Sequence, residues 1–310
     1  MKLFVEAPFS AENRSFLLNS ISDCELCENP EQAEIFVGDL PKNVGFPNLK
    51  FLQICFAGAE KYCREKMVPD NVVISNVTGA FGEVISEYII GTILSVYRRF
   101  FGYKSLQNAK IWRDLGSERT IFGENALILG CGNIGSETAK RLKAFGARIV
   151  GIRRNPRPTE FFDEVYGIEN LEEQLQKADL IISCLPETPY TIGLIGSEKI
   201  TLMKKNALFV NVGRGSVVDE NALVEALENE KIFGAVLDVF SEEPLPESSP
   251  LWSLPNLFIT PHISGKSFGH SPIIERKIAE ICAENINLFM AGKMPKNVIY
   301  RDVGYAEKCK

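Results

Sequence analysis

The feature that most constrains this chain is the glycine-rich segment GCGNIG at 130–135. It directly follows the apolar run ALIL at 126–129 and precedes a helical pattern through 136–145. In such a segment the first glycine permits a tight turn, the second lets a pyrophosphate approach the backbone, and the third lets helix and strand pack closely. Free N–H groups at the helix start then face the phosphate charge. The flanking strand and helix favour a dinucleotide-binding motif over an incidental glycine-rich turn.

The residues after the next predicted strand indicate which dinucleotide is bound. This strand, at 148–152, ends where the motif usually carries an acidic residue for the adenosine ribose hydroxyls, but here Arg153 and Arg154 follow it. Guanidinium groups suit a 2′-phosphate through charge-assisted hydrogen bonds. Two solvated surface arginines are the alternative. Because the acid is also missing, the sequence favours NADP over NAD as the cofactor.

The alternation of apolar strands with helical segments predicts two α/β domains. The strands expected around the glycine motif are 126–129, 148–152, 180–184, 207–211, 234–237 and 257–259. Earlier strands are expected at 3–6, 33–37, 51–55 and 72–74, and apolar spacing predicts one long helix from 82 to about 103.

These elements predict two doubly wound parallel-sheet domains, with a Rossmann dinucleotide-binding domain inserted into a smaller flavodoxin-like domain. The length of 310 residues agrees, because it exceeds the usual size of one hydrophobic core. The expected boundaries assign 93–273 to the dinucleotide-binding domain. A smaller substrate domain takes 1–92 and the returning helix and tail at 274–310.

Charge and hydropathy exclude several classes of protein. Lys and Arg number 34 against 40 Asp and Glu, and the resulting net charge of −6 argues against a protein that coats nucleic acid. No apolar run approaches the roughly 20 residues that span a bilayer, and the first residues do not resemble a signal peptide. We therefore expect a cytoplasmic protein with neither nucleic-acid nor membrane partners.

The cysteines are scattered and do not form a disulfide framework. Cys24 and Cys27 make a Cys-x-x-Cys pair, but no second pair and no histidine cluster completes a zinc set. We interpret the thiols as structural and expect no metal, with a metal or redox role of the pair as the alternative. The eight cysteines are Cys24, Cys27, Cys55, Cys63, Cys131, Cys184, Cys282 and Cys309.

Three further segments stand out: NVGRG at 211–215, LDVFSEEP at 237–244 and TPHISG at 260–265. Together with the glycine motif they resemble the D-isomer-specific 2-hydroxyacid dehydrogenase family. The likeness extends to a substrate loop at 51–59, the acid Glu87 of a bridging helix, and a closing segment at 285–298. It implies that Arg214, Glu243 and His262 are the catalytic arginine, acid and histidine.

Physical chemistry supports those three roles. Hydride transfer to a ketone leaves negative charge on oxygen, so the site needs a proton donor that titrates near neutrality. Of the two histidines, His262 follows a strand at the ligand-binding edge of the sheet, whereas His270 begins a polar helix. Glu243 would orient the imidazole and favour its charged form, and Arg214 would hold a substrate carboxylate bidentately. A surface charge or a satisfied core histidine is the alternative for each residue alone.

Other contacts follow from the resemblance. It assigns Leu185 and Pro186 to the adenine and ribose side, Thr191 to a polar contact beside them, and Asp238 to the nicotinamide carboxamide. Backbone N–H groups of the loop at 56–59, in particular those of Ala57 and Gly58, would receive the substrate carboxylate, with a simple strand-to-helix turn as the alternative. The expected cofactor set is Gly130, Gly132, Asn133, Ile134, Gly135, Arg153, Arg154, Leu185, Pro186, Thr191, Val212, Gly213, Asp238 and Gly265.

The resemblance implies an NADP- or NAD-dependent oxidoreductase of the glyoxylate/hydroxypyruvate reductase or glycerate dehydrogenase type, with its active site in the cleft between the domains. A phosphoglycerate dehydrogenase-like enzyme and a nucleotide-sensing, corepressor-like protein are the alternatives. A formate dehydrogenase is disfavoured, because Pro261 precedes His262 where that branch carries glutamine. A homodimer is expected, with the segment 109–112 as an arm toward the partner; Trp112 as a local anchor is the alternative.

Overall fold

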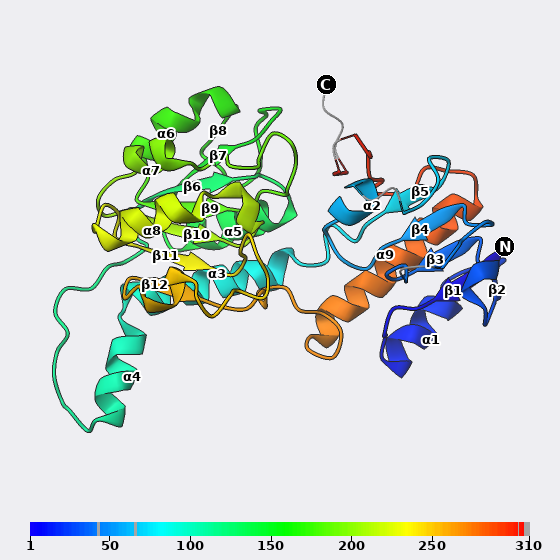
Figure 1. Cartoon of the computed structure of the whole chain (residues 1–310), viewed down its shortest axis with the longest axis horizontal. Coiled ribbons are helices and arrows are strands. Elements are labelled where there is room, and N and C mark those ends of the chain that lie inside the picture. The colour runs from blue at the N-terminus through cyan, green and yellow to red at the C-terminus, as the bar shows by residue number, and fades with distance from the viewer. Residues whose placement is uncertain (42–43, 65–66, 303, 307–310) are drawn as a thin grey trace. The chain divides into compact units, whose positions relative to one another are not determined.

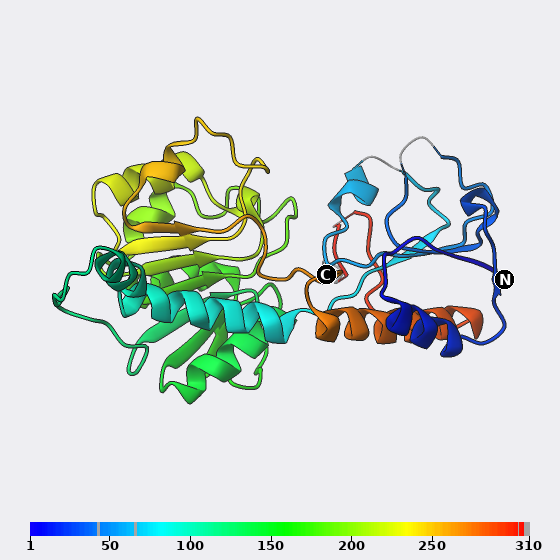
Figure 2. The same ribbon diagram turned by 90° about the horizontal axis from the view of Figure 1, so that it is seen from below.

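The computed structural model describes residues 1–41, 44–64, 67–302 and 304–306, so Cys309 lies outside the described residues. The chain divides into two compact units. Unit 1 comprises Met1–Ala80 with Lys266–Lys310, and unit 2 comprises Phe81–Gly265. Each unit is built around its own parallel sheet (Figures 1 and 2).

Unit 2 contains a seven-stranded parallel sheet, in the order β12-β11-β10-β9-β6-β7-β8. All six expected strands are present. The seventh, β8, escaped the sequence analysis because its three residues are all half-buried and lack an apolar run. The strands are β6 (Asn125–Leu129), β7 (Arg148–Ile152), β8 (Glu164–Tyr166), β9 (Leu180–Ser183), β10 (Leu208–Asn211), β11 (Gly234–Leu237) and β12 (Leu257–Ile259). The chain order reverses on either side of β6, which is the switch point where open α/β sheets bind ligands.

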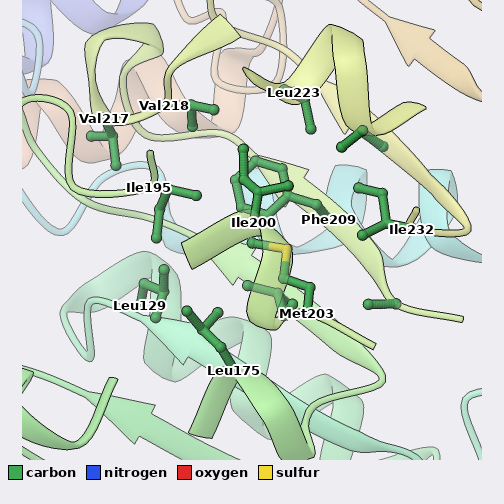
Figure 3. Close-up of a cluster of buried hydrophobic side chains, with 14 of the residues drawn as sticks. Leu129, Leu175, Ile195, Ile200, Met203, Phe209, Val217, Val218, Leu223 and Ile232 are labelled. Atoms are coloured by element: carbon green, nitrogen blue, oxygen red, sulfur yellow. The ribbon is translucent and has the colours of Figure 1, made fainter. Parts of the chain in front are cut away.

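The core of unit 2 lies between this sheet and the helices that cover it. Figure 3 shows Leu175 of α6, Ile200 of α7 and Leu223 of α8 among the apolar side chains of this cluster, together with Phe209 of β10. Burying each such side chain contributes roughly 1.5–3 kcal/mol. The helices are α5 (Asn133–Ala144), α6 (Leu171–Lys177), α7 (Ser197–Leu202) and α8 (Glu220–Glu228), with short 3₁₀ segments at Ile168–Asn170, Gly215–Val217 and Pro250–Ser253.

The expected long helix is divided in two. Helix α3 (Gly82–Tyr97) ends near Arg99, whose left-handed φ of 54° interrupts the helix before α4 (Phe100–Asn108) begins. All of α3 belongs to unit 2, whereas the boundary expected from the sequence, at 92, falls inside this helix. The helix stays with unit 2 because it packs along α5 and buries apolar residues such as Ile89 and Ile93.

Unit 1 contains a five-stranded parallel sheet in the order β2-β1-β3-β4-β5, which is the flavodoxin-like order. The strands are β1 (Lys2–Val5), β2 (Glu25–Leu26), β3 (Ile35–Val37), β4 (Phe51–Gln53) and β5 (Val73–Ser75). The remaining elements are α1 (Ala11–Asn19), the 3₁₀ segment Pro30–Gln32, α2 (Glu60–Arg64) and α9 (Pro272–Met290). The expected two-domain α/β fold is therefore confirmed.

A buried asparagine ties the returning helix to the sheet of unit 1. Asn285 on α9 donates to Oε1 of Gln53 at 2.8 Å and to Oγ of Ser75 at 3.1 Å. Its own Oδ1 accepts the N–H of Lys296 at 2.8 Å. These bonds fasten α9 and the segment after it to β4 and β5, which accounts for the position of the closing segment.

The remaining expectations concern membranes, metals and thiols. Every helix in the described ranges is too short or too polar to cross a bilayer. Within the same ranges no three His, Cys, Asp or Glu side chains are grouped to hold a metal ion. Burial raises the pKa of Cys24 and Cys27, which keeps both thiols mostly protonated at neutral pH.

Candidate active site

Most of the predicted site residues lie on loops that leave the carboxyl ends of strands in unit 2. The segments after β6, β7 and β9 carry most of the predicted cofactor residues. Those after β10, β11 and β12 carry Arg214, Glu243 and His262 together with the remaining cofactor residues. In a parallel sheet all these ends share one edge, where open α/β folds bind ligands. The substrate loop is separate, because Ala57 and Gly58 belong to unit 1.

The glycine motif forms a tight cradle between β6 and α5. Gly130 has a φ of 99°, a conformation that side chains disfavour. A Cβ at Gly135 would lie 2.0 Å from the carbonyl oxygen of Gly130, so the third position tolerates only glycine. No side chain caps the first N–H groups of α5 at Gly132, and the buried Oδ1 of Asn133 has no hydrogen-bond partner among the described residues. The open N–H donors at this helix start fit a dinucleotide pyrophosphate.

The loops after β7 and β9, beside this cradle, carry the residues that are predicted to bind the adenosine part of the cofactor. Sγ of Cys131 in the glycine motif donates to the carbonyl of Ile152 at 3.6 Å, so Arg153, the next residue, begins beside this motif. Nη1 of Arg153 donates to Oγ1 of Thr159 at 3.4 Å. Arg154 places its guanidinium 5.9 Å from the ring centre of Tyr190, on the loop after β9. Sequence reasoning missed Tyr190, an aromatic side chain that is 67% exposed on a cofactor-side loop.

Two further predicted positions, Thr191 and Gly213, shape the loop after β9. Oγ1 of Thr191 donates to the carbonyl of Pro186 at 2.6 Å, so this hydroxyl closes the loop on itself. A Cβ at Gly213 would lie 2.4 Å from the carbonyl oxygen of Leu185. These two contacts bring Leu185, Pro186, Thr191 and Gly213 together, and their binding of the cofactor stays a prediction.

His262 and Glu243 meet directly. Nδ1 of His262 lies 2.8 Å from Oε2 of Glu243, and Oε1 of Glu243 accepts the N–H of Phe240 at 2.9 Å. Since a carboxylate only accepts, Nδ1 carries the hydrogen of this bond, which leaves Nε2 for a reacting group. The side chain of His262 is 49% exposed, so a substrate can reach it. Its φ of 51° is rare for a residue with a side chain, a strain typical of functional positions.

Arg214 lies on a loop that packs tightly against the loop of Glu243. Asn211 fastens the Arg214 loop, because its Nδ2 donates to the carbonyl of Arg214 at 3.0 Å and its Oδ1 accepts the N–H of Gly213 at 3.1 Å. A Cβ at Gly215 would lie 1.9 Å from the backbone of Phe240, three residues before Glu243. The close approach that only glycine allows thus brings the two loops together.

Asp238 is buried directly after β11, and its contact with the nicotinamide carboxamide stays a prediction. It is 0% exposed, and its carboxylate accepts the N–H groups of Ile263 and Ser264, each at 2.9 Å. Its backbone oxygen accepts the N–H of His262 at 2.9 Å. Asp238 therefore holds the turn that carries the histidine, a role that no sequence signal indicated.

In unit 1, a buried asparagine holds the expected substrate loop. Nδ2 of Asn76 donates to the carbonyl of Ala57 at 2.6 Å, while its Oδ1 accepts the N–H of Thr78 at 3.0 Å. In a trans peptide the following N–H points away from this carbonyl, so Asn76 fixes the direction of the Gly58 donor. Sequence reasoning missed Asn76 because its hydrogen-bond partner, Ala57, follows a different strand, β4.

Known proteins resemble the chain over nearly its whole length. The family model for D-isomer specific 2-hydroxyacid dehydrogenase, NAD binding domain, matches residues 90–264. The chain is 30% identical to a glyoxylate reductase of Korarchaeum cryptofilum, over 96% of this chain and 88% of that protein.

Two solved structures share the fold as well. A D-isomer specific 2-hydroxyacid dehydrogenase family protein from Aeromonas salmonicida has a TM-score of 0.87 at 31% identity, over 97% of this chain and 99% of that one. An NADPH-dependent glyoxylate/hydroxypyruvate reductase from Sinorhizobium meliloti, in complex with NADP and sulfate, has a TM-score of 0.80 at 26% identity, over 98% and 99%.

Proposed function

The chain belongs to the D-isomer specific 2-hydroxyacid dehydrogenase family, and from this premise we propose that it reduces glyoxylate, hydroxypyruvate or a similar short 2-oxo acid to the D-2-hydroxy acid. It is an NAD(P)-dependent oxidoreductase. The observation that carries this proposal is the pair of His262 and Glu243. Nδ1 of His262 lies 2.8 Å from Oε2 of Glu243. The His262 side chain is exposed, and its backbone is strained, with a φ of 51°. Its similarity to glyoxylate and hydroxypyruvate reductases supports this substrate class.

In the proposed mechanism the side chains of unit 2 manage charge and protons. When bound, the reduced nicotinamide supplies a hydride to C2 of the substrate. His262 donates a proton from Nε2 to the ketone oxygen, so C=O becomes CH–OH and the imidazolium becomes neutral imidazole. Glu243 stabilises the charged ring before transfer, and Arg214 binds the substrate carboxylate and polarises the ketone. We assign the N–H groups of Ala57 and Gly58 to the same carboxylate.

The cradle and its neighbouring loops would hold the cofactor. Arg153 and Arg154 lie where NAD-binding proteins carry an acid that hydrogen-bonds the ribose hydroxyls. The two arginines therefore favour NADP over NAD. The similar reductase from Sinorhizobium meliloti with NADP bound supports this preference. The residues proposed to line the cofactor are Gly130, Gly132, Asn133, Ile134, Gly135, Arg153, Arg154, Leu185, Pro186, Thr191, Val212, Gly213, Asp238 and Gly265.

Replacing Arg153 with Asp should shift cofactor preference toward NADH. The change removes a charge-assisted bond to the 2′-phosphate and adds repulsion, so we expect the ratio of kcat/KM for NADPH over NADH to fall about 10- to 100-fold. Steady-state kinetics with both cofactors measure the ratio. Lys205→Asp, an exposed position with the same charge change, serves as the control. An unchanged ratio in Arg153→Asp would show that Arg153 does not read the phosphate.

A substrate panel tests the function itself. Purified protein should oxidise NADPH with glyoxylate and hydroxypyruvate faster than with longer 2-oxo acids or phosphohydroxypyruvate. Preference for phosphohydroxypyruvate would favour the phosphoglycerate dehydrogenase alternative. Tight NADPH binding without oxidation by any 2-oxo acid would contradict the enzyme proposal and favour a nucleotide-sensing protein.

We also propose that the protein is a homodimer. Helix α4 and the segment after it extend away from the sheet of unit 2 (Figure 1). This arm exposes large apolar side chains, with Trp112 104% and Phe100 55% exposed. Exposed apolar surface of this kind marks an interaction site. Light scattering should therefore give about twice the 34.5 kDa chain mass, and Trp112→Asp should lower it; a monomeric mass for the unaltered chain would contradict the proposal.

A further inference from the structure

The contact between Arg154 and Tyr190 joins two loops of unit 2 that strand β6 separates. The sheet runs in the order β9-β6-β7, so the strands before Tyr190 and Arg154 are two strand spacings, about 10 Å, apart. Only long side chains from both loops can meet across this distance. The guanidinium carbon of Arg154 lies 5.9 Å from the ring centre of Tyr190. The pair therefore bridges the end of β6, where the glycine motif begins.

We infer that Tyr190 is a positioning residue for Arg154 and thereby a determinant of the preference for NADP over NAD. Arg154 directly follows Arg153 after β7, where the 2′-phosphate of NADP is expected. The ring acts on the cofactor through the guanidinium that it positions. This inference rests on the cofactor preference proposed above.

Hydrogen bonds hold the turn that carries Tyr190. The buried Thr188 donates its N–H to Oγ1 of Thr191 at 2.8 Å, and its own Oγ1 accepts the N–H of Tyr190 at 3.3 Å. Further along, the N–H of Gly193 donates to the carbonyl of Ser216 at 2.8 Å, which fastens the turn to the segment after β10. These bonds fix the backbone of Tyr190, so a rigid base presents the exposed ring.

An aromatic ring suits the positioning of a phosphate-binding arginine better than an acid would. The ring attracts the guanidinium by its charge and does not use the N–H donors that a phosphate needs. A carboxylate in the same place would neutralise the cation and compete for those donors. Arg154 is exposed, and a partner that limits its rotamers beforehand reduces the entropy that phosphate binding costs.

The two arginines differ in their surroundings. Nη1 of Arg153 donates to Oγ1 of Thr159 at 3.4 Å, within the segment that follows β7. Arg154 instead reaches Tyr190 on the loop after β9. Loss of the Tyr190 ring should therefore resemble a partial loss of Arg154 and should be independent of Arg153.

A matched pair of substitutions at Tyr190 tests the inference. Tyr190→Leu removes the ring, whereas Tyr190→Phe keeps the ring and removes only the hydroxyl. We expect the dissociation constant of NADP⁺, measured by calorimetry, to rise about 2- to 5-fold in Tyr190→Leu and to stay within about 1.5-fold in Tyr190→Phe. The dissociation constant of NAD⁺, which has no 2′-phosphate, should be equal in the two variants and the unaltered protein.

Double variants show whether the ring acts through Arg154. Arg154→Gln should weaken NADP⁺ binding by itself, and adding Tyr190→Leu to it should cause no further loss. Tyr190→Leu should keep its full effect when it is added to Arg153→Gln. Phe145→Leu is the control for loss of an exposed ring, because Phe145 is 42% exposed at the end of α5 opposite the glycine motif. Thermal unfolding confirms that each variant is folded.

A measurement on the cofactor-free protein reports the positioning directly. Side-chain ¹⁵N relaxation should show a more mobile Arg154 guanidinium in Tyr190→Leu than in Tyr190→Phe. Equal mobility in the two variants, together with equal NADP⁺ affinity, would overturn the inference. Equal weakening of NADP⁺ and NAD⁺ binding in Tyr190→Leu would overturn it too, because the ring would then contact a part that both cofactors share.

The outcomes separate this inference from the proposed function. If Arg153→Asp shifts the cofactor preference but Tyr190→Leu does not, only the role of Tyr190 fails. If the unaltered protein binds NADP⁺ no more tightly than NAD⁺, the proposed preference fails and this inference fails with it. Absence of 2-oxo acid reduction would contradict the proposed enzyme, and the binding measurements would still decide the role of Tyr190.

Discussion

Replacing His262 with Asn is expected to lower kcat for 2-oxo acid reduction by about 10²- to 10⁴-fold, the usual contribution of a positioned general acid. The amide cannot donate a proton to the developing alkoxide, whereas the protonated imidazole can. Asn also tolerates the left-handed backbone that His262 adopts, with its φ of 51°. The substitution therefore removes the proton donor without breaking the turn, and steady-state kinetics with NADPH measure the loss.

Two measurements keep this result specific to the imidazole. NADPH affinity should stay within about threefold, and the free energy of unfolding within about 0.5 kcal/mol, because the His262 side chain is half exposed. His270→Asn is the matched control, since His270 is the other histidine of the chain and should be replaceable without loss. A His262→Asn variant with normal kcat, or equal losses in both variants, would remove His262 as the proton donor.

Gly135→Ala should destabilise unit 2 by about 2 kcal/mol or more and lower NADPH affinity by on the order of tenfold. The added Cβ would lie 2.0 Å from the carbonyl oxygen of Gly130, a backbone atom that moves only if the whole cradle moves. Displacing this cradle misaligns the N–H donors at the start of α5. Denaturant unfolding and calorimetric titration with NADPH measure the two losses.

Gly91→Ala is the control for this substitution, because Gly91 also lies in a helix but has nothing within 4 Å of its added Cβ. Helix propensity alone predicts that alanine stabilises a helix by up to about 1 kcal/mol at either position. We expect that gain only at Gly91, with unchanged NADPH binding. Stabilisation at both positions would show that the cradle has room for a methyl group at position 135.

The cofactor side of the site was accessible from sequence because its signal is local. A strand, three spaced glycines and a helix start lie within twenty residues, and the structure has β6, the cradle and α5 at those positions. The arginine at position 153, in place of an acid, is also a local signal, because it directly follows strand β7. Strands with an apolar run were found for the same reason, whereas the half-buried β8 and the short, exposed β2 lack such a run.

Residues that act through distant partners were missed. Asn76 is an ordinary asparagine until folding places Ala57 beside it. Asp238 resembles a cofactor ligand in sequence, and only the structure shows that its carboxylate also accepts N–H groups of the His262 turn. The extent of α3 was also overestimated, since a left-handed residue at Arg99 is not visible in apolar spacing.

The sequence by itself determined the two α/β sheets and the dinucleotide motif, since each depends on residue type and spacing along the chain. The catalytic histidine, acid and arginine were implied by the resemblance that three further segments carry. Only the tertiary structure decided that Nδ1 of His262 lies 2.8 Å from Oε2 of Glu243 and that Asp238 is fully buried. The physical reason is that hydrogen bonds require partners within about 3 Å, and packing alone sets such distances between residues far apart in the chain.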